Sequence, residues 1–268
     1  MPELPEIETI RSNMQEHRGA RIMAVQLMRD DILRQRDYEP NRLVGQTLSA
    51  FRRRGKYLII EVGDKYYLII HLGMSGRFYA LAEAEAHDLP HVHFIIHLDR
   101  EQKLIYQDPR RFGGIWLCRE DTQLFQKMGP EPLSAEFTRS YLQRVLNRSQ
   151  SAVKNVLLNQ QHIAGLGNIY VDEALFASGI RPDRPAASLR EDELKHLHRA
   201  IRTVLRSGIE QRGTSFRDYR DGFNRPGDFQ NYLRVYGKEG QPCPRCGHLI
   251  TKIVIGGRGT HFCEHCQS

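Results

Sequence analysis

The residues that follow Met1 place a nucleophile beside an acid. Removal of Met1 would give Pro2 a free secondary amine, which can attack a sugar aldehyde carbon and form an iminium. Glu3 could then move protons during such a reaction. Taken alone, however, Pro2 and Glu3 are more typical of a helix start, because proline and acidic residues favour the first helical turn. Glu6 fits either a buried position near Pro2 or a surface position on that helix.

Four of the five cysteines lie in two C-x-x-C pairs near the end of the chain, and sixteen residues separate the pairs: Cys243, Cys246, Cys263 and Cys266. This spacing predicts one tetrahedral Zn²⁺ site, although two disulfides or a redox pair would use the same residue type. Four thiolates fill the coordination sphere, so the zinc is expected to be structural. It should hold a hairpin of residues 249–255 and 261–262 around a turn at 256–259. We expect Cys118 to be a buried strand residue.

Composition narrows the class of protein. The chain has 268 residues, with 39 Lys and Arg against 32 Asp and Glu, and a net charge of +7. No stretch approaches the ~20 apolar residues that a membrane helix needs, and the N-terminus lacks the basic and apolar regions of a signal peptide. We therefore expect a cytosolic protein. The positive charge favours an anionic partner, with nucleic acid ahead of a membrane surface.

The pattern of elements predicts an α+β protein. Residues 51–76 form two strand-rich runs around a Gly63–Asp64 turn, and residues 91–107 form another pair. One helix should precede them, since Ile7, Ile10 and Met14 have helical spacing. Helical segments are expected at 134–149, 153–161, 168–179 and 189–211, and a long loop at 212–227. The two prolines within 129–132 mark the boundary between the halves.

Six motifs occur in order along the chain: MPELPEIET at the start, RRGKYL at 53–58, HLGMSG at 71–76, DPRRFG at 108–113, AGLGNIY at 164–170 and GGRGTHFCEHCQ at 256–267. Together they resemble bacterial formamidopyrimidine-DNA glycosylase from end to end. The resemblance implies an antiparallel β-sandwich flanked by helices at 1–130, a helix–two-turn–helix module at 131–233 and a four-cysteine zinc finger at 234–268. It also implies a monomer, without a membrane partner, that binds double-stranded DNA containing oxidised bases or abasic sites in the cleft between domains.

The same resemblance implies the catalytic residues. Pro2 would attack C1′ of an extruded nucleotide, and Glu3 would help to open the sugar ring by protonating its oxygen. Lys56 is the family's proton donor for β-elimination, and Arg258 is the donor associated with δ-elimination. A guanidinium is effectively always protonated, so we expect Arg258 to bind and polarise the phosphate. Without the family, Lys56 reads as part of a solvated strand face and Arg258 as a turn residue.

The resemblance also implies the contacts to DNA. Met74 and Phe112 would fill the space left by the extruded base, and Arg110 would hydrogen-bond the widowed base. Core packing is the simpler reading of Met74 and Phe112, but the glycines around Met74 favour an exposed turn. The remaining contacts would go to phosphates, with Asn168 also fitting a helix cap: His91, Arg110, Arg148, Lys154 and Asn168.

These residues together predict a bifunctional DNA glycosylase and lyase of base excision repair that acts on oxidised purines. Two other readings stay open. The related endonuclease VIII type prefers oxidised pyrimidines, but Leu4 stands where that branch commonly has glycine. A non-catalytic zinc-containing DNA-binding protein would also explain the basic charge and the four cysteines, although such a protein has no use for a penultimate proline beside a carboxylate.

Overall fold

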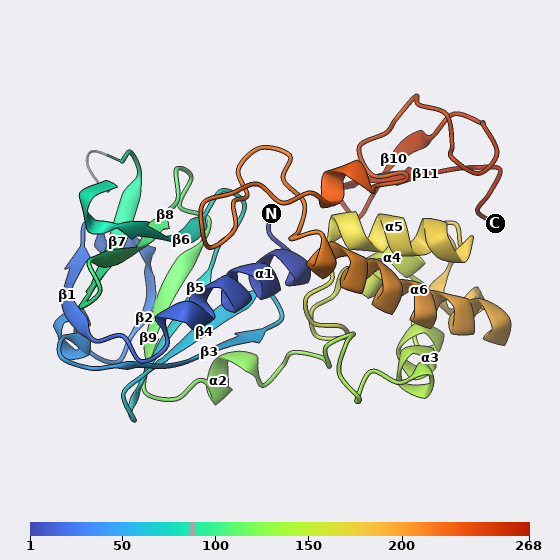
Figure 1. The fold of residues 1–268 in the computed structure, drawn as a ribbon. Coiled ribbons are helices and arrows are strands. Elements are labelled where there is room, and N and C mark those ends of the chain that lie inside the picture. The colour runs from blue at the N-terminus through green and yellow to red at the C-terminus, as the bar shows by residue number, and fades with distance from the viewer. Residues whose placement is uncertain (86–88) are drawn as a thin grey trace. The chain divides into compact units, whose positions relative to one another are not determined.

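A computed structural model describes residues 1–85 and 89–268 of the chain (Figure 1). These residues form two compact units. The first comprises Met1–Gln126 and Gly208–Gln230, and the second comprises Lys127–Ser207 and Asn231–Ser268. The mixture of helices and sheets confirms the predicted α+β class. None of the described helices has the length and apolar character of a membrane span.

The chain begins with helix α1, Leu4–Met14, as the sequence predicts. Glu3 is the N-cap residue, and it forms a reciprocal capping box with Glu6, which stabilises the first turn by satisfying backbone N–H groups. One face of the helix is fully buried against the sandwich and contains Ile7, Ile10 and Met14. The spacing of these apolar residues thus determines how α1 packs.

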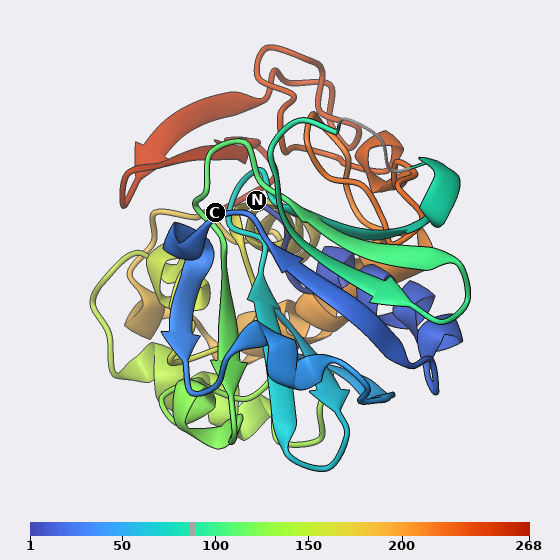
Figure 2. The same cartoon turned by 90° about the vertical axis from the view of Figure 1, so that its left-hand side faces the viewer.

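Within the described residues, the sandwich consists of nine strands in two sheets (Figure 2): β1 Ile22–Leu27, β2 Leu33–Arg36, β3 Leu48–Arg54, β4 Tyr57–Val62, β5 Tyr66–His71, β6 Arg77–Ala82, β7 Val92–Leu98, β8 Gln102–Gln107 and β9 Gly114–Cys118. One sheet has the order β1-β7-β8-β6 and the other β2-β9-β5-β4-β3. Pairing is antiparallel in the described strands except between β2 and β9, which run parallel.

Most of the expected strands are present. The β4–β5 and β7–β8 hairpins occur where the sequence places them, and Cys118 is a buried residue of β9. The first expected run, however, is divided into β3 and β4 by a two-residue turn, Gly55–Lys56. Gly55 has φ of +57°, a conformation that glycine adopts without steric cost and that tight hairpin turns require. The turn places Lys56 at the end of a hairpin.

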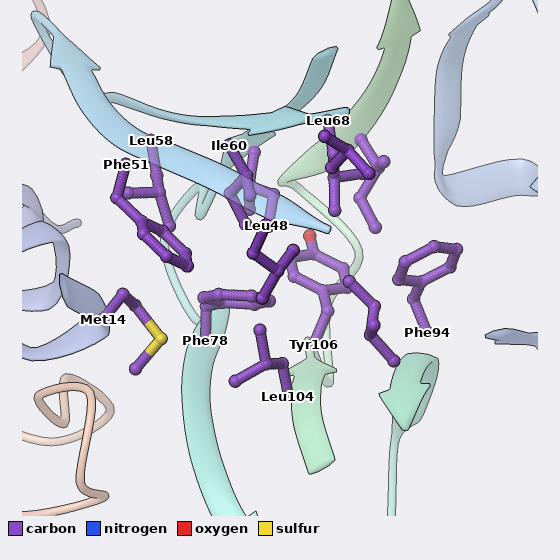
Figure 3. Close-up of a cluster of buried hydrophobic side chains, with 14 of the residues drawn as sticks. Met14, Leu48, Phe51, Leu58, Ile60, Leu68, Phe78, Phe94, Leu104 and Tyr106 are labelled. Atoms are coloured by element: carbon purple, nitrogen blue, oxygen red, sulfur yellow. The ribbon is translucent and has the colours of Figure 1, made fainter. Parts of the chain in front are cut away.

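The core between the two sheets is almost entirely apolar. Side chains from α1 and from both sheets meet there (Figure 3), among them Met14, Phe51, Leu58, Phe78, Phe94, Leu104 and Tyr106. Burial of a large apolar side chain contributes about 1.5–3 kcal/mol to stability. The core therefore fixes the strand ends, from which the functional loops extend.

Two connections between the sheets lie next to each other because of strand register. Residues 72–76 join β5 to β6, and residues 108–113 join β8 to β9. His71 pairs with Gly114 in one sheet, and Arg77 pairs with Gln107 in the other. Both ends of one connection are therefore paired with the ends of the other. The topology brings HLGMSG and DPRRFG together.

The other helices and the last hairpin follow: α2 Thr122–Phe125, α3 Arg139–Asn147, α4 Val153–Leu158, α5 Asn168–Ser178, α6 Glu191–Glu210, β10 Thr251–Ile255 and β11 Arg258–Phe262. Short 3₁₀ turns occur at Gln15–His17, Asp30–Ile32, Pro40–Leu43, Glu83–Glu85, Ala186–Ser188 and Phe229–Asn231. Helix α3 begins later than the sequence suggests, because Thr138, not Ser134, caps it by accepting the Tyr141 N–H at 3.1 Å. Residues 212–227 contain neither helix nor strand, as expected.

Candidate functional site

Glu6 connects the N-terminus to the start of the loop at 212–227. Its side chain is 1 % exposed. One carboxylate oxygen accepts the Glu3 N–H at 2.7 Å and the other accepts the Thr214 N–H, also at 2.7 Å. Tyr219 strengthens the connection by donating its hydroxyl to the Glu6 carbonyl at 3.3 Å, and burial raises the pKa of this phenol well above its usual range. Glu6 is thus buried, and it fixes the peptide that follows Pro2.

Pro2 and Glu3 are both buried in the first unit, at the start of α1. Lys56 is 6 % exposed, so it does not belong to a solvated strand face. Arg53 holds its turn in place by donating to the Gly55 carbonyl at 3.1 Å and by pairing with Glu8 of α1 at 2.9 Å. The hairpin that carries Lys56 is therefore attached directly to the helix that carries Glu3.

His71 lies between Lys56 and the loop at 72–76. Desolvation by burial and the nearby charge of Lys56 together lower the pKa of His71 to about 4, although Asp108 partly opposes the shift. The ring nitrogen Nδ1 accepts the Gly73 N–H at 3.2 Å, which requires that nitrogen to be unprotonated. The imidazole is consequently neutral near pH 7 and adds no second positive charge beside Lys56.

Met74, Arg110 and Phe112 lie on the two adjacent connections, and all three are exposed. Met74 is 46 % exposed and Phe112 61 %, so these large apolar side chains are not part of the core. The connections touch backbone to backbone, because a Cβ on Gly73 would lie 2.4 Å from the Gly113 nitrogen. The Arg110 guanidinium lies 5.6 Å from the centroid of the Phe112 ring. The structure therefore brings these three predicted residues onto one surface.

The buried carboxylate of Asp108 holds the two connections together. It accepts the Ser75 hydroxyl at 2.6 Å, the Gly113 N–H at 2.9 Å and the Tyr106 hydroxyl at 3.3 Å. Asp108 is completely buried, and a buried charge of this kind is tolerated when such donors surround it. The bond to Ser75 crosses from one connection to the other. Asp108 thus positions Met74 and Phe112.

His91 is attached to the same centre through the backbone. The Asp108 N–H donates to the His91 carbonyl at 3.1 Å, and His93 Nε2 bonds the Asp108 carbonyl at 2.9 Å. His91 itself is exposed and has φ of +62°. Arg34 supports the connection from the other side with a 2.7 Å bond to the Gly113 carbonyl. The structure thus groups His91 with Arg110, Met74 and Phe112.

Sequence reasoning missed both Asp108 and Arg34. Asp108 had a local signal, because aspartate before proline in DPRRFG is typical of a turn in which the side chain binds nearby N–H groups. Arg34 had none, since the carbonyls of Arg111 and Gly113 that it binds lie about eighty residues away in the chain.

In the second unit, Arg258 is the first residue of β11 and is exposed. The turn before it contains only Gly256 and Gly257, with φ of +55° and +74°, so it is shorter than the turn expected at 256–259. Asn168, the first residue of α5, donates to the Gly259 carbonyl at 2.8 Å. The structure thus places Asn168 beside the strand that carries Arg258.

Lys154 and Arg148 have different surroundings. The Lys154 side chain is 0 % exposed and pairs with Asp172 at 2.6 Å, whereas the sequence suggests a surface contact to DNA. Arg148 is exposed at the C-terminal end of α3, as a phosphate contact requires. It lines a polar pocket with Arg144 and His162.

The four cysteines form one cluster that suits a metal ion. The sulfur atoms of Cys243, Cys246, Cys263 and Cys266 all lie within 4.8 Å of one another. Two of the separations are 3.8 Å and 3.5 Å. A tetrahedral ion with metal–sulfur bonds of about 2.3 Å requires sulfur atoms roughly 3.8 Å apart, so the cluster fits zinc. The Arg245 N–H also points at the Cys243 sulfur, at 3.4 Å.

Comparison with known proteins decides the family. Family models match three consecutive parts of the chain: the formamidopyrimidine-DNA glycosylase N-terminal domain at residues 1–115, the H2TH domain of the same enzymes at 128–220, and a zinc finger found in FPG and IleRS at 240–268. The chain belongs to the formamidopyrimidine-DNA glycosylase family. The match confirms the expected sandwich, helix–two-turn–helix module and zinc finger, and it identifies the cysteine cluster as a metal-binding element.

Full-length relatives and solved structures support the same family assignment. The chain is 54 % identical to the formamidopyrimidine-DNA glycosylase of Syntrophomonas wolfei, with 100 % of each chain covered. It is 40 % identical to that of Bacillus subtilis, covering 100 % of this chain and 99 % of that protein. A Lactococcus lactis FPG mutant bound to DNA containing Fapy-dG superposes with a TM-score of 0.93 at 38 % identity, covering 99 % of both chains. MutM in complex with DNA containing carbocyclic 8-oxo-G gives a TM-score of 0.92 at 38 % identity, again covering 99 % of both.

The buried bonds of Asp108 give a stability prediction. Asp108→Asn should lower the free energy of unfolding by about 1–3 kcal/mol, because a neutral amide has one acceptor oxygen and would leave the buried Gly113 N–H facing a donor. Urea unfolding monitored by circular dichroism measures the change. Asp64→Asn, in the exposed β4–β5 turn, is the matched control and should change stability by less than about 0.5 kcal/mol. Equal effects of the two substitutions would contradict the role of Asp108.

The lowered pKa of His71 gives a pH prediction. The unfolded chain takes up a proton at this residue near pH 6.5, whereas the folded chain does so only near pH 4. Stability from His71 is therefore complete above pH 6.5 and is lost as the pH falls towards 4, by up to about 3 kcal/mol. His71→Gln should flatten this part of the stability profile, measured by urea unfolding at each pH. The same substitution at exposed His196 is the control, and equal slopes for wild type and His71→Gln would contradict the assignment.

Proposed function

We propose that this protein is a bifunctional DNA glycosylase and lyase of base excision repair. It removes oxidised purines, 8-oxoguanine and formamidopyrimidines, from double-stranded DNA through a covalent intermediate on Pro2. The observation that carries the proposal is the anchored N-terminus, in which Glu6 holds the Glu3 N–H at 2.7 Å beside the predicted nucleophile. The family assignment and the solved complexes of relatives with lesion-containing DNA support the substrate class.

Base removal begins at Pro2. After loss of Met1, the secondary amine attacks C1′ of the extruded nucleotide, the bond to the base breaks, and the sugar ring opens as an iminium forms. Glu3 protonates the ring oxygen in this step. Glu3 is 2 % exposed, so it acts in a site largely shielded from water, where electrostatic interactions are strengthened. Glu6 keeps the intervening peptide in place.

Strand cleavage follows from the iminium, which withdraws electrons and acidifies the C2′ hydrogens. Loss of a C2′ proton breaks the bond from C3′ to the 3′ phosphate, and Lys56 supplies the proton in this elimination. Lys56 suits this role because it is almost buried and the neighbouring His71 is neutral. A second elimination releases the 5′ phosphate, with Arg258 binding and polarising that group. The product is a one-nucleotide gap.

Extrusion of the base needs a replacement in the stack, because flipping costs a few kcal/mol. Met74 and Phe112 supply apolar surface, and Arg110 supplies hydrogen-bond donors to the unpaired base. Arg110 also lies 3.5 Å from Asp218 in the loop at 212–227. When Arg110 contacts DNA, it would leave Asp218 and form hydrogen bonds to the unpaired base instead. The rigidity imposed by Asp108 keeps the three side chains ready for insertion.

Phosphate contacts supply the remaining affinity without reading sequence. We assign them to the exposed His91 and Arg148 and to the N-terminal end of α5 at Asn168. Lys154 is fully buried, and it supports the strand next to Asn168 from inside the second unit.

We further propose that the four cysteines hold one structural Zn²⁺ ion. Cys243, Cys246, Cys263 and Cys266 would bind it, leaving no open position for a substrate. When bound, the ion supplies folding energy and takes no part in the reaction. The buried Gln267 side chain holds one of these cysteines in place. It accepts the Cys263 N–H at 2.9 Å and donates to the Ile180 carbonyl at 2.8 Å. The metal would thus stabilise the hairpin that presents Arg258.

Borohydride trapping tests the covalent step. Protein without Met1, confirmed by intact mass, should form a stable complex with duplex DNA containing one 8-oxoguanine when borohydride reduces the iminium. Protein that retains Met1 is the matched control, because an amide nitrogen at Pro2 cannot attack C1′ while every side chain is unchanged. Absence of a trapped complex with the processed protein would refute the proposed chemistry and leave a non-catalytic DNA-binding protein.

Substrate preference needs a separate comparison. Duplexes containing 8-oxoguanine should be cleaved faster than duplexes containing thymine glycol under the same single-turnover conditions. Gel separation of the cleaved strand measures both rates. The reverse order would favour an endonuclease VIII type of specificity.

Zinc removal should abolish DNA binding. A chelator that strips the ion should unfold the β10–β11 hairpin, and fluorescence anisotropy should then show loss of affinity for lesion-containing duplex. Readdition of zinc should restore binding. Full activity of zinc-free protein, with metal content checked by mass spectrometry, would contradict the structural role.

A further inference from the structure

A fully buried ion pair joins α4 to α5 in the second unit. The Lys154 ammonium group lies 2.6 Å from the Asp172 carboxylate, and both side chains are 0 % exposed. Removing two charges from water is costly, and the attraction between them compensates for this cost only when further hydrogen bonds satisfy the remaining donors and acceptors. The groups that form these additional hydrogen bonds therefore show which part of the structure the ion pair holds in place.

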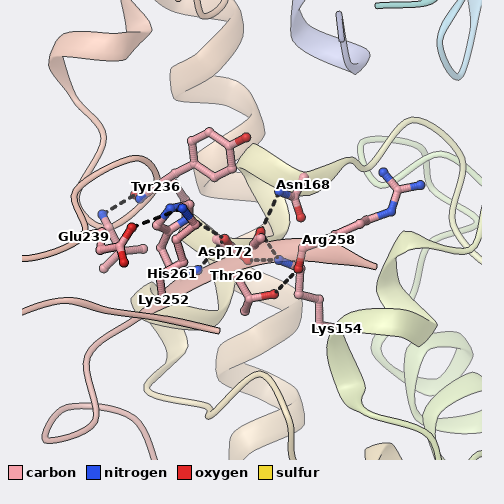
Figure 4. Close-up of polar contacts among 12 residues, drawn as sticks. Lys154, Asn168, Asp172, Tyr236, Glu239, Lys252, Arg258, Thr260 and His261 are labelled. Carbon is pink, nitrogen blue, oxygen red and sulfur yellow. Dashed lines mark hydrogen bonds and ion pairs between the residues drawn. The ribbon is translucent and has the colours of Figure 1, made fainter. Parts of the chain in front are cut away.

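Both members of the pair bind the same strand, β11. Lys154 donates to the Gly259 carbonyl at 3.2 Å. The second oxygen of Asp172 accepts the His261 N–H at 2.9 Å, and the His261 ring lies 3.4 Å from the same oxygen. Figure 4 shows these bonds meeting the strand at alternate residues. The pair thus fixes β11 at two points.

Two further contacts restrain the same hairpin. Asn168 at the start of α5 donates to the Gly259 carbonyl at 2.8 Å, so this one oxygen receives donors from two helices. At the turn, a Cβ added to Gly256 would lie 2.3 Å from the amide oxygen of Asn155, the residue after Lys154 on α4. The hairpin therefore lies directly against α4 at its turn and is hydrogen-bonded to both helices at Gly259.

Arg258 lies between the restrained positions. Its neighbour Gly259 is held by Lys154 and Asn168, and the Thr260 hydroxyl bonds the Arg258 carbonyl at 3.0 Å. The Arg258 side chain is exposed and extends away from the buried network (Figure 4). The network consequently fixes the backbone from which the guanidinium extends, without touching the guanidinium itself.

We infer that Lys154 and Asp172 are positioning residues for Arg258 and that they determine how completely the second elimination follows the first. The inference rests on the proposed function. In that second step the C4′ proton leaves, its electron pair forms the C4′–C5′ double bond, and the bond from C5′ to oxygen breaks with its electrons passing to the 5′ phosphate. A guanidinium displaced by about 1 Å stabilises that leaving group far less.

The test compares Lys154→Met with wild-type zinc-loaded protein on duplex DNA containing one abasic site. In a single turnover, the rate of the second elimination should fall about tenfold to hundredfold, so that the product of the first elimination accumulates. The rate of borohydride trapping at Pro2 should stay within about twofold of wild type. Asp172→Asn should give the same change in products.

Lys252→Met provides a matched control on the same hairpin. Lys252 forms an exposed ion pair with Glu239 at 3.1 Å, with side chains 43 % and 58 % exposed. Such a pair contributes little to structure, so this variant should give the wild-type ratio of products. A folded, zinc-loaded Lys154→Met protein with that same ratio would overturn the inference.

A second variant distinguishes a displaced Arg258 from a protein that fails to fold. Lys154→Met combined with Asp172→Leu leaves no unpaired buried charge, and apolar replacement of a buried pair is commonly tolerated. This variant should fold, bind zinc and still accumulate the first product. If both variants lose zinc, the pair maintains the finger as a whole and the inference is wrong. If wild-type protein forms no trapped complex, the proposed function itself fails, whatever the product ratio.

Discussion

The candidate functional surfaces of this protein depend on one kind of interaction, the hydrogen bond from a main-chain N–H group to a buried carboxylate. Asp108 binds the Gly113 N–H and joins the connections that carry Met74 and Phe112. Glu6 binds the Glu3 N–H at the start of α1 and the Thr214 N–H in the loop at 212–227. A buried carboxylate is costly without such donors, so each one strongly disfavours any arrangement of its loop that would leave the charge unsatisfied.

The second unit repeats this principle on neighbouring residues of α5. Asp172 holds β11 through the His261 N–H, and Glu173 accepts the N–H groups of residues 234–236 at 2.8 to 3.1 Å. Desolvation raises the pKa of Glu173, while these three donors oppose that rise. One helix therefore fixes both the hairpin and the segment that leads to the zinc finger.

Local signals in the sequence were sufficient for much of this structure. Helical spacing in α1, the β4–β5 and β7–β8 hairpins and the cysteine spacing each depend on residues close together in the chain. The sequence places the start of α3 too early because Ser134 and Thr138 are both acceptable caps, and it is Thr138 that accepts the Tyr141 N–H. Resemblance to the family implies that Lys154 contacts DNA, and nothing local signals its burial, because its partner Asp172 lies eighteen residues away on another helix. Strand register brings Gly73 next to Gly113, forty residues away in the chain, so no local pattern reveals that contact.

The net charge of +7 includes arginines that are paired with carboxylates and arginines that are not, and the two groups differ in what they can bind. Arg53 pairs with Glu8, and Arg184 pairs with Glu193, so these cations serve the fold. Among the residues that the structure describes, no carboxylate lies within ion-pair distance of Arg148 or Arg258, and both are exposed. A guanidinium with no internal partner keeps its full attraction for a phosphate. The charge left available to a phosphate is thus a small part of the total, and for Arg258 the buried Asp172 holds the strand that presents it.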